Sequence, residues 1–166
     1  MQTIWKTLVP ETKQTVDQFF NEILLELLSC MGNKSWRIRE ASAMGMIDLL
    51  TGRKLGEVEP VFDRVWQMAM RVMDDIKESV RVAGNALCRM LSQWIIRLCD
   101  SEQTIQRDNT AERALAIVMP FLLNKGVLSD AEEVRSFSLD TITKLCRIAG
   151  PFLRPYGRQR HKETGI

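Results

Sequence analysis

The chain has 166 residues, about the length of one domain, and its 45% apolar and 27% charged residues are typical of a globular protein. The formal net charge is only +2, and the excess of basic residues lies in residues 151–166, so total charge gives no support for nucleic-acid binding. The single His, His161, excludes a zinc site built on two or three His and leaves no good candidate for Ser-His-Asp or Cys-His catalysis.

The first half of the chain is expected to form three helices. An apolar stripe with spacings of three and four spans residues 16–31, and Gly32-Asn33 ends it because both residues tolerate the left-handed backbone of a helix C-terminus. A second helix is expected over residues 35–51 behind a Ser cap, and a third over residues 60–72 with a Pro in its first turn. Residues 52–57 between them are expected to form a polar loop.

The second half of the chain is expected to form three more helices, over residues 76–98, 110–124 and 131–148. Asp74-Asp75 is the expected cap of the first, and Ser129-Asp130 is the expected cap of the last. Pro120 is expected to kink the middle helix or to end its regular part. The polar residues 100–109 are expected to form a loop, and no segment shows the alternation of a strand.

A short pattern recurs in the second helix of each expected pair, around an arginine. The three arginines are Arg39, Arg81 and Arg135. A β-branched residue precedes each one, and three positions later stands a small residue, namely Ser42, Gly84 or Ser138. The first Arg-to-Arg spacing lies within the period of roughly 40–47 residues of HEAT and armadillo repeats, and the second does so if residues 100–109 are an insertion.

These observations predict an all-α fold, an α-solenoid of HEAT/armadillo-like helical hairpins with about three repeats and six main helices. The expected repeats cover about residues 12–52, 58–100 and 110–150, within a segment 1–150 that a polar, basic tail 151–166 follows. A single hairpin cannot bury its apolar face alone, so the hairpins are expected to stack. The small residues after each arginine are expected to let neighbouring helices approach closely.

The arginine pattern resembles the HEAT-repeat consensus, in which a Val-Arg step lies early in the second helix of each pair. The resemblance implies that Arg39, Arg81 and Arg135 form a ladder that reaches acidic caps in the same or the adjacent repeat. Asp75 and Asp130 are the candidate acids of that ladder.

A sharper resemblance rests on four segments in the same order. They are residues 71–81 (RVMDDIKESVR, the most specific), 36–42 (WRIREAS), 48–53 (DLLTGR) and 124–135, which begins NKGVLS. Together they resemble the Ecm family of large HEAT-repeat proteasome adaptor and scaffold proteins, over roughly residues 15–156. The resemblance implies a non-catalytic segment that binds the core and regulatory particles of the proteasome in the cytoplasm and nucleus. It also implies a contribution to proteasome assembly, quality control or tethering.

Other interpretations of the sequence stay open. The chain could be a HEAT-type scaffold of another pathway, or a truncated product without independent function that self-associates through uncapped solenoid ends. We expect no enzyme activity, cofactor, small-molecule substrate or nucleic-acid partner. Membrane insertion is not expected either, because the longest uncharged apolar run, residues 114–123, is too short to cross a bilayer. The four Cys lack CxxC spacing and are expected to be buried free thiols of a reducing compartment.

Overall fold

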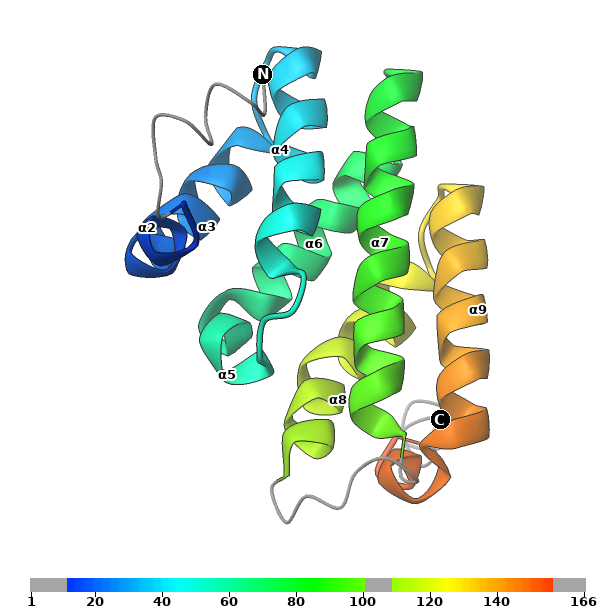
Figure 1. Cartoon of the computed structure of the whole chain (residues 1–166). Coiled ribbons are helices and arrows are strands. Elements are labelled where there is room, and N and C mark those ends of the chain that lie inside the picture. The colour runs from blue at the N-terminus through cyan, green and yellow to red at the C-terminus, as the bar shows by residue number, and fades with distance from the viewer. Residues whose placement is uncertain (1–11, 101–108, 157–166) are drawn as a thin grey trace.

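The computed structural model describes residues 12–100 and 109–156 (Figure 1). In chain order its α-helices are α2 (Thr12–Gln18), α3 (Phe20–Cys30), α4 (Trp36–Leu50), α5 (Leu55–Val58), α6 (Phe62–Met73), α7 (Glu78–Cys99), α8 (Thr110–Phe121) and α9 (Glu132–Ile148). Three shorter helical segments are η1 (Glu59–Val61), the π-helical η2 (Leu122–Gly126) and η3 (Gly150–Leu153). The described residues contain helices and no strand, which confirms the all-α class.

The helices form two layers. Helices α4, α7 and α9 stand side by side in one layer, with α7 in contact with both of its neighbours (Figure 1). Helices α3, α6 and α8 form the other layer, in which α6 contacts both α3 and α8. The hairpins α3–α4 and α6–α7 join the layers, and η2 packs α8 against α9 in the third. Residues 12–100 and 109–156 therefore form a row of three packed helical hairpins.

Three details differ from the expected elements or refine them. The first expected helix is divided at Phe19 into α2 and α3. The expected loop over residues 52–57 contains α5, because Leu55 and Val58 are buried and the Glu57 carboxylate accepts the Lys54 N–H at 2.8 Å. Pro120 lies in the last turn of α8, and the regular helix ends directly after it, as expected. Most of the expected loop over residues 100–109, and residues 157–166 of the tail, lie outside the described residues.

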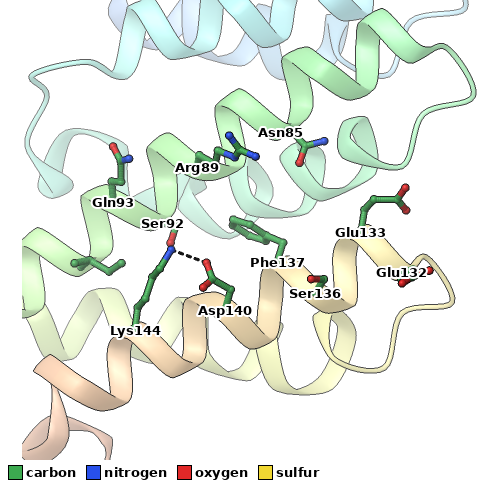
Figure 2. A pocket seen from close by; sticks show the side chains of 11 residues that line it. Asn85, Arg89, Ser92, Gln93, Glu132, Glu133, Ser136, Phe137, Asp140 and Lys144 are labelled. Atoms are coloured by element: carbon green, nitrogen blue, oxygen red, sulfur yellow. Dashed lines mark hydrogen bonds and ion pairs between the residues drawn. The ribbon is translucent and has the colours of Figure 1, made fainter.

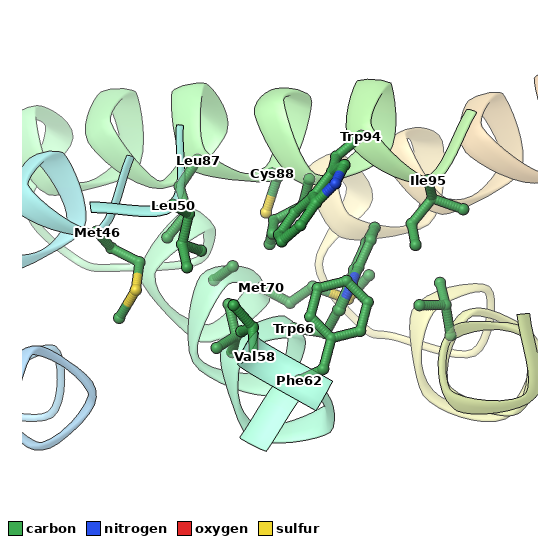
Figure 3. Packing of buried hydrophobic residues seen from close by; sticks show 14 of the residues in the cluster. Met46, Leu50, Val58, Phe62, Trp66, Met70, Leu87, Cys88, Trp94 and Ile95 are labelled. Carbon is green, nitrogen blue, oxygen red and sulfur yellow. The ribbon is translucent and has the colours of Figure 1, made fainter. Parts of the chain in front are cut away.

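One continuous apolar core joins the hairpins (Figure 3). At its centre Phe62 lies edge-on to Trp66 and to Trp94, with ring centroids 6.3 Å and 5.5 Å apart. Edge-on packing suits aromatic rings because the positive edge of one meets the negative face of the other. Methionines fill the remaining space, and Met46 and Met73 are completely buried. Most methionines on helices thus belong to the core, although Met44 is half exposed.

Gly84 marks the closest approach between two helices. A Cβ atom on this residue of α7 would lie 2.4 Å from the Met73 backbone nitrogen at the end of α6. No side chain fits in that space, since real Cβ atoms essentially never come within 3.0 Å of another heavy atom. This contact confirms, for the second hairpin, the expectation that a small residue after the arginine allows close helix packing.

Candidate functional site

The three arginines of the repeated pattern make the same contacts with the loop that precedes their helix. Each donates Nη1 to two successive main-chain carbonyl oxygens. Arg39 donates to Asn33 and Lys34 (2.9 and 3.1 Å), Arg81 to Asp75 and Ile76 (2.9 and 3.2 Å), and Arg135 to Ser129 and Asp130 (2.7 and 2.8 Å). A guanidinium group suits this role because its planar fork holds several donors in fixed directions. The arginine thus ties each loop to its own helix.

The side chain six positions before each arginine completes the loop. Its oxygen accepts the N–H of the residue two positions later: Asn33 from Ser35 (2.9 Å), Asp75 from Lys77 (2.9 Å) and Ser129 from Ala131 (3.2 Å). Short polar side chains commonly close turns in this way. Equivalent positions of the three loops therefore hold Asn, Asp and Ser. Asp130 lies one residue further along and contributes its main-chain carbonyl to Arg135.

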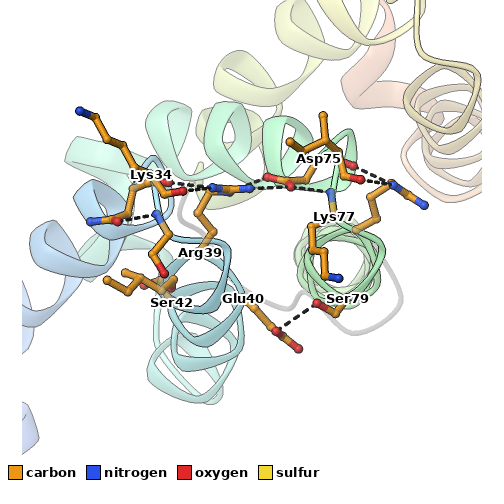
Figure 4. Close-up of polar contacts among 12 residues, drawn as sticks. Lys34, Arg39, Glu40, Ser42, Asp75, Lys77 and Ser79 are labelled. Carbon is orange, nitrogen blue, oxygen red and sulfur yellow. Dashed lines mark hydrogen bonds and ion pairs between the residues drawn. The ribbon is translucent and has the colours of Figure 1, made fainter.

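Only Asp75 is acidic among these three positions, and it joins the first two hairpins (Figure 4). Arg39 of α4 binds its carboxylate with two hydrogen bonds, Nε to Oδ2 at 2.6 Å and Nη2 to Oδ1 at 2.8 Å. The two side chains are 14% and 10% exposed, so solvent screens this pair less than a surface pair. We call this paired contact the Arg39–Asp75 clasp.

The surroundings of Asp75 favour its charged form. The hydrogen bond from Arg39 is the main cause that holds the pKa of the Asp75 carboxyl below its usual range, against the opposing effect of burial. The Lys77 amide and the charges of Arg39 and Arg81 lower the pKa further. Next to the clasp, Ser79 donates to Glu40 at 3.1 Å and the Lys77 ammonium lies 5.0 Å from the centroid of the Trp36 ring. Polar contacts therefore join α4 and α7 near their N-terminal ends, and an open hollow of about 560 Å³ remains between the two helices further along.

The junction between α7 and α9 is built differently. Its buried polar contact is a hydrogen bond between the Ser92 and Thr141 hydroxyls, whose oxygens are 3.1 Å apart. Beside this pair an open groove of about 810 Å³ follows the two helices (Figure 2). Asn85, Arg89, Ser92, Gln93 and Ile96 line it from α7, and Glu132, Glu133, Ser136, Phe137, Asp140 and Lys144 line it from α9.

The groove is polar at its rims and partly aromatic at its floor. Phe137 is half-buried there, and its ring lies 6.4 Å from the ring of Trp66 in the core. Asp140 is paired with Lys144 at 2.6 Å on the same helix. Glu132 and Glu133 lie in the first turn of α9, where the positive end of the helix dipole favours them. The groove can thus offer carboxylates, amides and an apolar surface to a partner.

The residues that the structure describes offer no cluster of metal-binding side chains. The only His lies outside them, and none of their His, Cys, Asp and Glu residues form a group of three or more that could hold a metal ion. Burial raises the pKa of the Cys88 thiol, and it raises the pKa of the Cys99 thiol to about 12, so neither is an activated nucleophile. Contrary to expectation, Cys146 is exposed and Cys30 is only partly buried.

No helix in residues 12–100 and 109–156 combines the length and the apolar character that a bilayer crossing requires. No model of a known protein family matches the sequence.

Several curated proteins match almost the whole chain, and three of them are described here. The human Proteasome adapter and scaffold protein ECM29 is 36% identical over 156 residues, which cover 94% of this chain and 8% of that protein. The Saccharomyces cerevisiae Proteasome component ECM29 is 38% identical over 157 residues, which again cover 94% of this chain and 8% of that protein. The Schizosaccharomyces pombe Proteasome component ecm29 is 35% identical over 162 residues, 94% of this chain and 9% of that protein. The chain therefore spans less than a tenth of the length of these relatives, and the matches confirm the resemblance that its motifs indicated.

Proposed function

We propose that this chain, a homologue of one segment of the ECM29 proteasome adaptors and scaffolds, is itself a non-catalytic proteasome-binding scaffold segment. The observation that carries the proposal is the extent of the match. Identity of 36–38% over 94% of the chain runs through all three hairpins and is not confined to one motif. The names of these relatives give proteasome association, and we extend that association to this chain.

The way the hairpins are held together supports a scaffold role. A scaffold needs a surface whose parts keep fixed positions, and stacked hairpins supply one because each packs on its neighbours. The Arg39–Asp75 clasp and the shared core around Trp66 join successive hairpins of this chain. We infer that these groups act as structural supports, and that partners bind the exposed residues of the α4, α7 and α9 layer.

We further propose that the hairpins are HEAT-type repeats with the boundaries expected from the sequence, about residues 12–52, 58–100 and 110–150. The identical contacts of Arg39, Arg81 and Arg135 with their loops support this proposal, since a repeat unit should recur in its hydrogen bonds as well as in its helices. In this proposal the ladder consists of the three arginines, each bound to the loop before its own helix. Asp75 is the acid of the ladder at the first junction, where it pairs with Arg39. A proteasome partner also implies a cytoplasmic and nuclear location for this chain.

Affinity purification tests the proposed function. Tagged 1–166 is purified from cells and the bound proteins are quantified by mass spectrometry, with an unrelated helical protein of similar size as the control. We expect core and regulatory proteasome subunits to be enriched at least tenfold over the control. Light scattering on the same preparation shows whether the chain is monomeric. A monomeric, folded chain that enriches subunits of another assembly and no proteasome would contradict the proposal and favour a scaffold of another pathway.

A further inference from the structure

We propose that the groove between α7 and α9 is a docking site for an extended polypeptide segment that carries basic side chains. The proposal rests on the proposed scaffold function and specifies it, because it names the surface of this chain and the chemistry of the partner segment. Its basis is the groove's shape, the polar groups on its two walls and its charge.

The groove has the dimensions of a short extended peptide. Asn85, Arg89 and Gln93 lie about one turn apart along α7, so this wall is about 12 Å long. An extended chain rises about 3.3 Å per residue and places about four residues along that length. The volume of about 810 Å³ and the open top leave room for their side chains.

The α7 wall offers groups that pair with a peptide backbone. Asn85 and Gln93 carry carboxamides, each with donor hydrogens and an acceptor oxygen. The Asn85 amide nitrogen donates to the Arg81 carbonyl at 3.2 Å, which fixes this side chain, and its oxygen is turned toward the groove (Figure 2). A carboxamide of this kind accepts a backbone N–H of any sequence. This wall therefore supplies affinity for an extended chain, and specificity comes from the opposite wall.

The charge of the α9 wall selects a basic segment. The groove holds the carboxylates of Glu132, Glu133 and Asp140 against two cations, and one of these, Lys144, is paired with Asp140. The remaining carboxylates, Glu132 and Glu133, are both exposed and outnumber the remaining cation, Arg89, by one. A Lys or Arg of the partner would bind there, while an apolar neighbour would cover Phe137 on the floor. The same carboxylates repel phosphate, so a nucleic acid is a poor occupant.

Peptide binding tests the groove directly. The probes are two labelled peptides, one of alternating Leu and Lys and one of alternating Leu and Glu, titrated with the folded chain by fluorescence anisotropy. We expect the Lys peptide to bind at least tenfold more tightly than the Glu peptide. The double variant Glu132→Lys/Glu133→Lys should weaken binding of the Lys peptide tenfold or more, and Glu132→Gln/Glu133→Gln should weaken it less. The matched control Asp63→Lys/Glu112→Lys changes two exposed acids of α6 and α8 and should leave binding within twofold.

Photo-cross-linking then separates the groove from the proposed function. A benzophenone amino acid replaces Gln93 in the groove or, as control, the exposed Gln67 of α6, and cells are irradiated before purification. We expect cross-links to proteasome subunits from position 93 only. Proteasome capture without a preference for position 93 would overturn the groove and leave the scaffold function standing. Peptide binding with no proteasome capture would overturn the scaffold function alone. Equal binding of both peptides, or no effect of the charge reversal, would overturn the docking site.

Discussion

The α4–α7 junction and the α7–α9 junction join helices that carry the same arginine–loop contacts, yet the two junctions present different surfaces. Between α4 and α7 the Arg39–Asp75 clasp and the Ser79–Glu40 hydrogen bond join the two helices near their N-terminal ends. Between α7 and α9 a buried hydroxyl pair, Ser92 and Thr141, holds the helices deeper down and an open groove lies beside it. Both junctions therefore keep open space between their helices, about 560 Å³ at the first and about 810 Å³ at the second, but the first is held by a charged clasp and the second by neutral hydroxyls.

One loop position differs in its chemistry between the two junctions. Asp75 and Ser129 occupy equivalent places, because the main-chain carbonyl of each accepts a hydrogen bond from an arginine Nη1 and the side chain of each accepts a backbone N–H. Only the carboxylate has a second oxygen that can reach an arginine of the preceding hairpin. An arginine–carboxylate pair with two parallel hydrogen bonds is among the stronger polar contacts in proteins. The loop at Ser129 therefore keeps the same internal hydrogen bonds as the loop at Asp75 and lacks the carboxylate that binds an arginine of the preceding hairpin.

The largest effect should come from Gly84→Ala, which damages the central hairpin that both junctions share. The new Cβ would lie 2.4 Å from the Met73 nitrogen, and backbone atoms cannot rotate away. We expect a loss of roughly 3 kcal/mol or more in the free energy of unfolding, measured by urea denaturation, at the upper end of overpacking effects. The control is Gly56→Ala in α5, where a Cβ meets nothing within 4 Å and stability should stay the same or rise slightly. Equal effects of the two substitutions would contradict the close helix contact.

Thr141→Val should weaken the second junction alone. It keeps the shape of the side chain and removes the hydroxyl that pairs with Ser92 in the core. A buried hydroxyl without its partner costs about 1–3 kcal/mol, and we expect a loss of unfolding free energy in this range. The double variant Ser92→Ala/Thr141→Val should recover most of the loss, because no unpaired hydroxyl is left. Additive losses in the double variant would show that the hydroxyl pair is not coupled.

Asp75→Asn should weaken the first junction in a pH-dependent way. The pKa of Asp75 is lowered in the folded protein, so its charged form contributes stability above the pKa of an unfolded Asp, about 4. This contribution is lost as the pH falls through the lower, folded pKa. We expect the wild type to melt a few degrees above Asp75→Asn at pH 7, with the difference shrinking steadily below pH 4. The control Asp140→Asn breaks an exposed pair within α9 and should change the melting temperature little at any pH.

The sequence predicted the helices and the arginines because both leave local signals. Apolar residues at spacings of three and four placed the main helices, and the repeated arginine singled out Arg39, Arg81 and Arg135. The sequence also named Asp75, which the structure joins to Arg39. It did not find α5, since four residues with two buried apolar positions are too few to show a period. Nor could it find the groove, because that space depends on how far apart two complete helices lie.

Ser129 holds a position that a search for acidic residues does not find, because its hydroxyl does in this loop what a carboxylate does in the preceding one. It also gives the test with the smallest expected effect. Asp130 is the nearer match to an acidic cap by charge, yet Ser129 holds the equivalent place because its hydroxyl accepts the Ala131 N–H at 3.2 Å. Ser129→Asp should place a carboxylate at the position that Asp75 holds in the preceding loop and, by pairing with Arg81, add a few tenths of a kcal/mol, up to about 1, to the free energy of unfolding. The same substitution combined with Arg81→Gln should give no gain. A gain that persists without Arg81 would mean that the new charge acts on the α9 dipole alone, and the second junction would then lack a place for a clasp. A gain that requires Arg81 would show that this one loop position decides whether the second junction has a clasp.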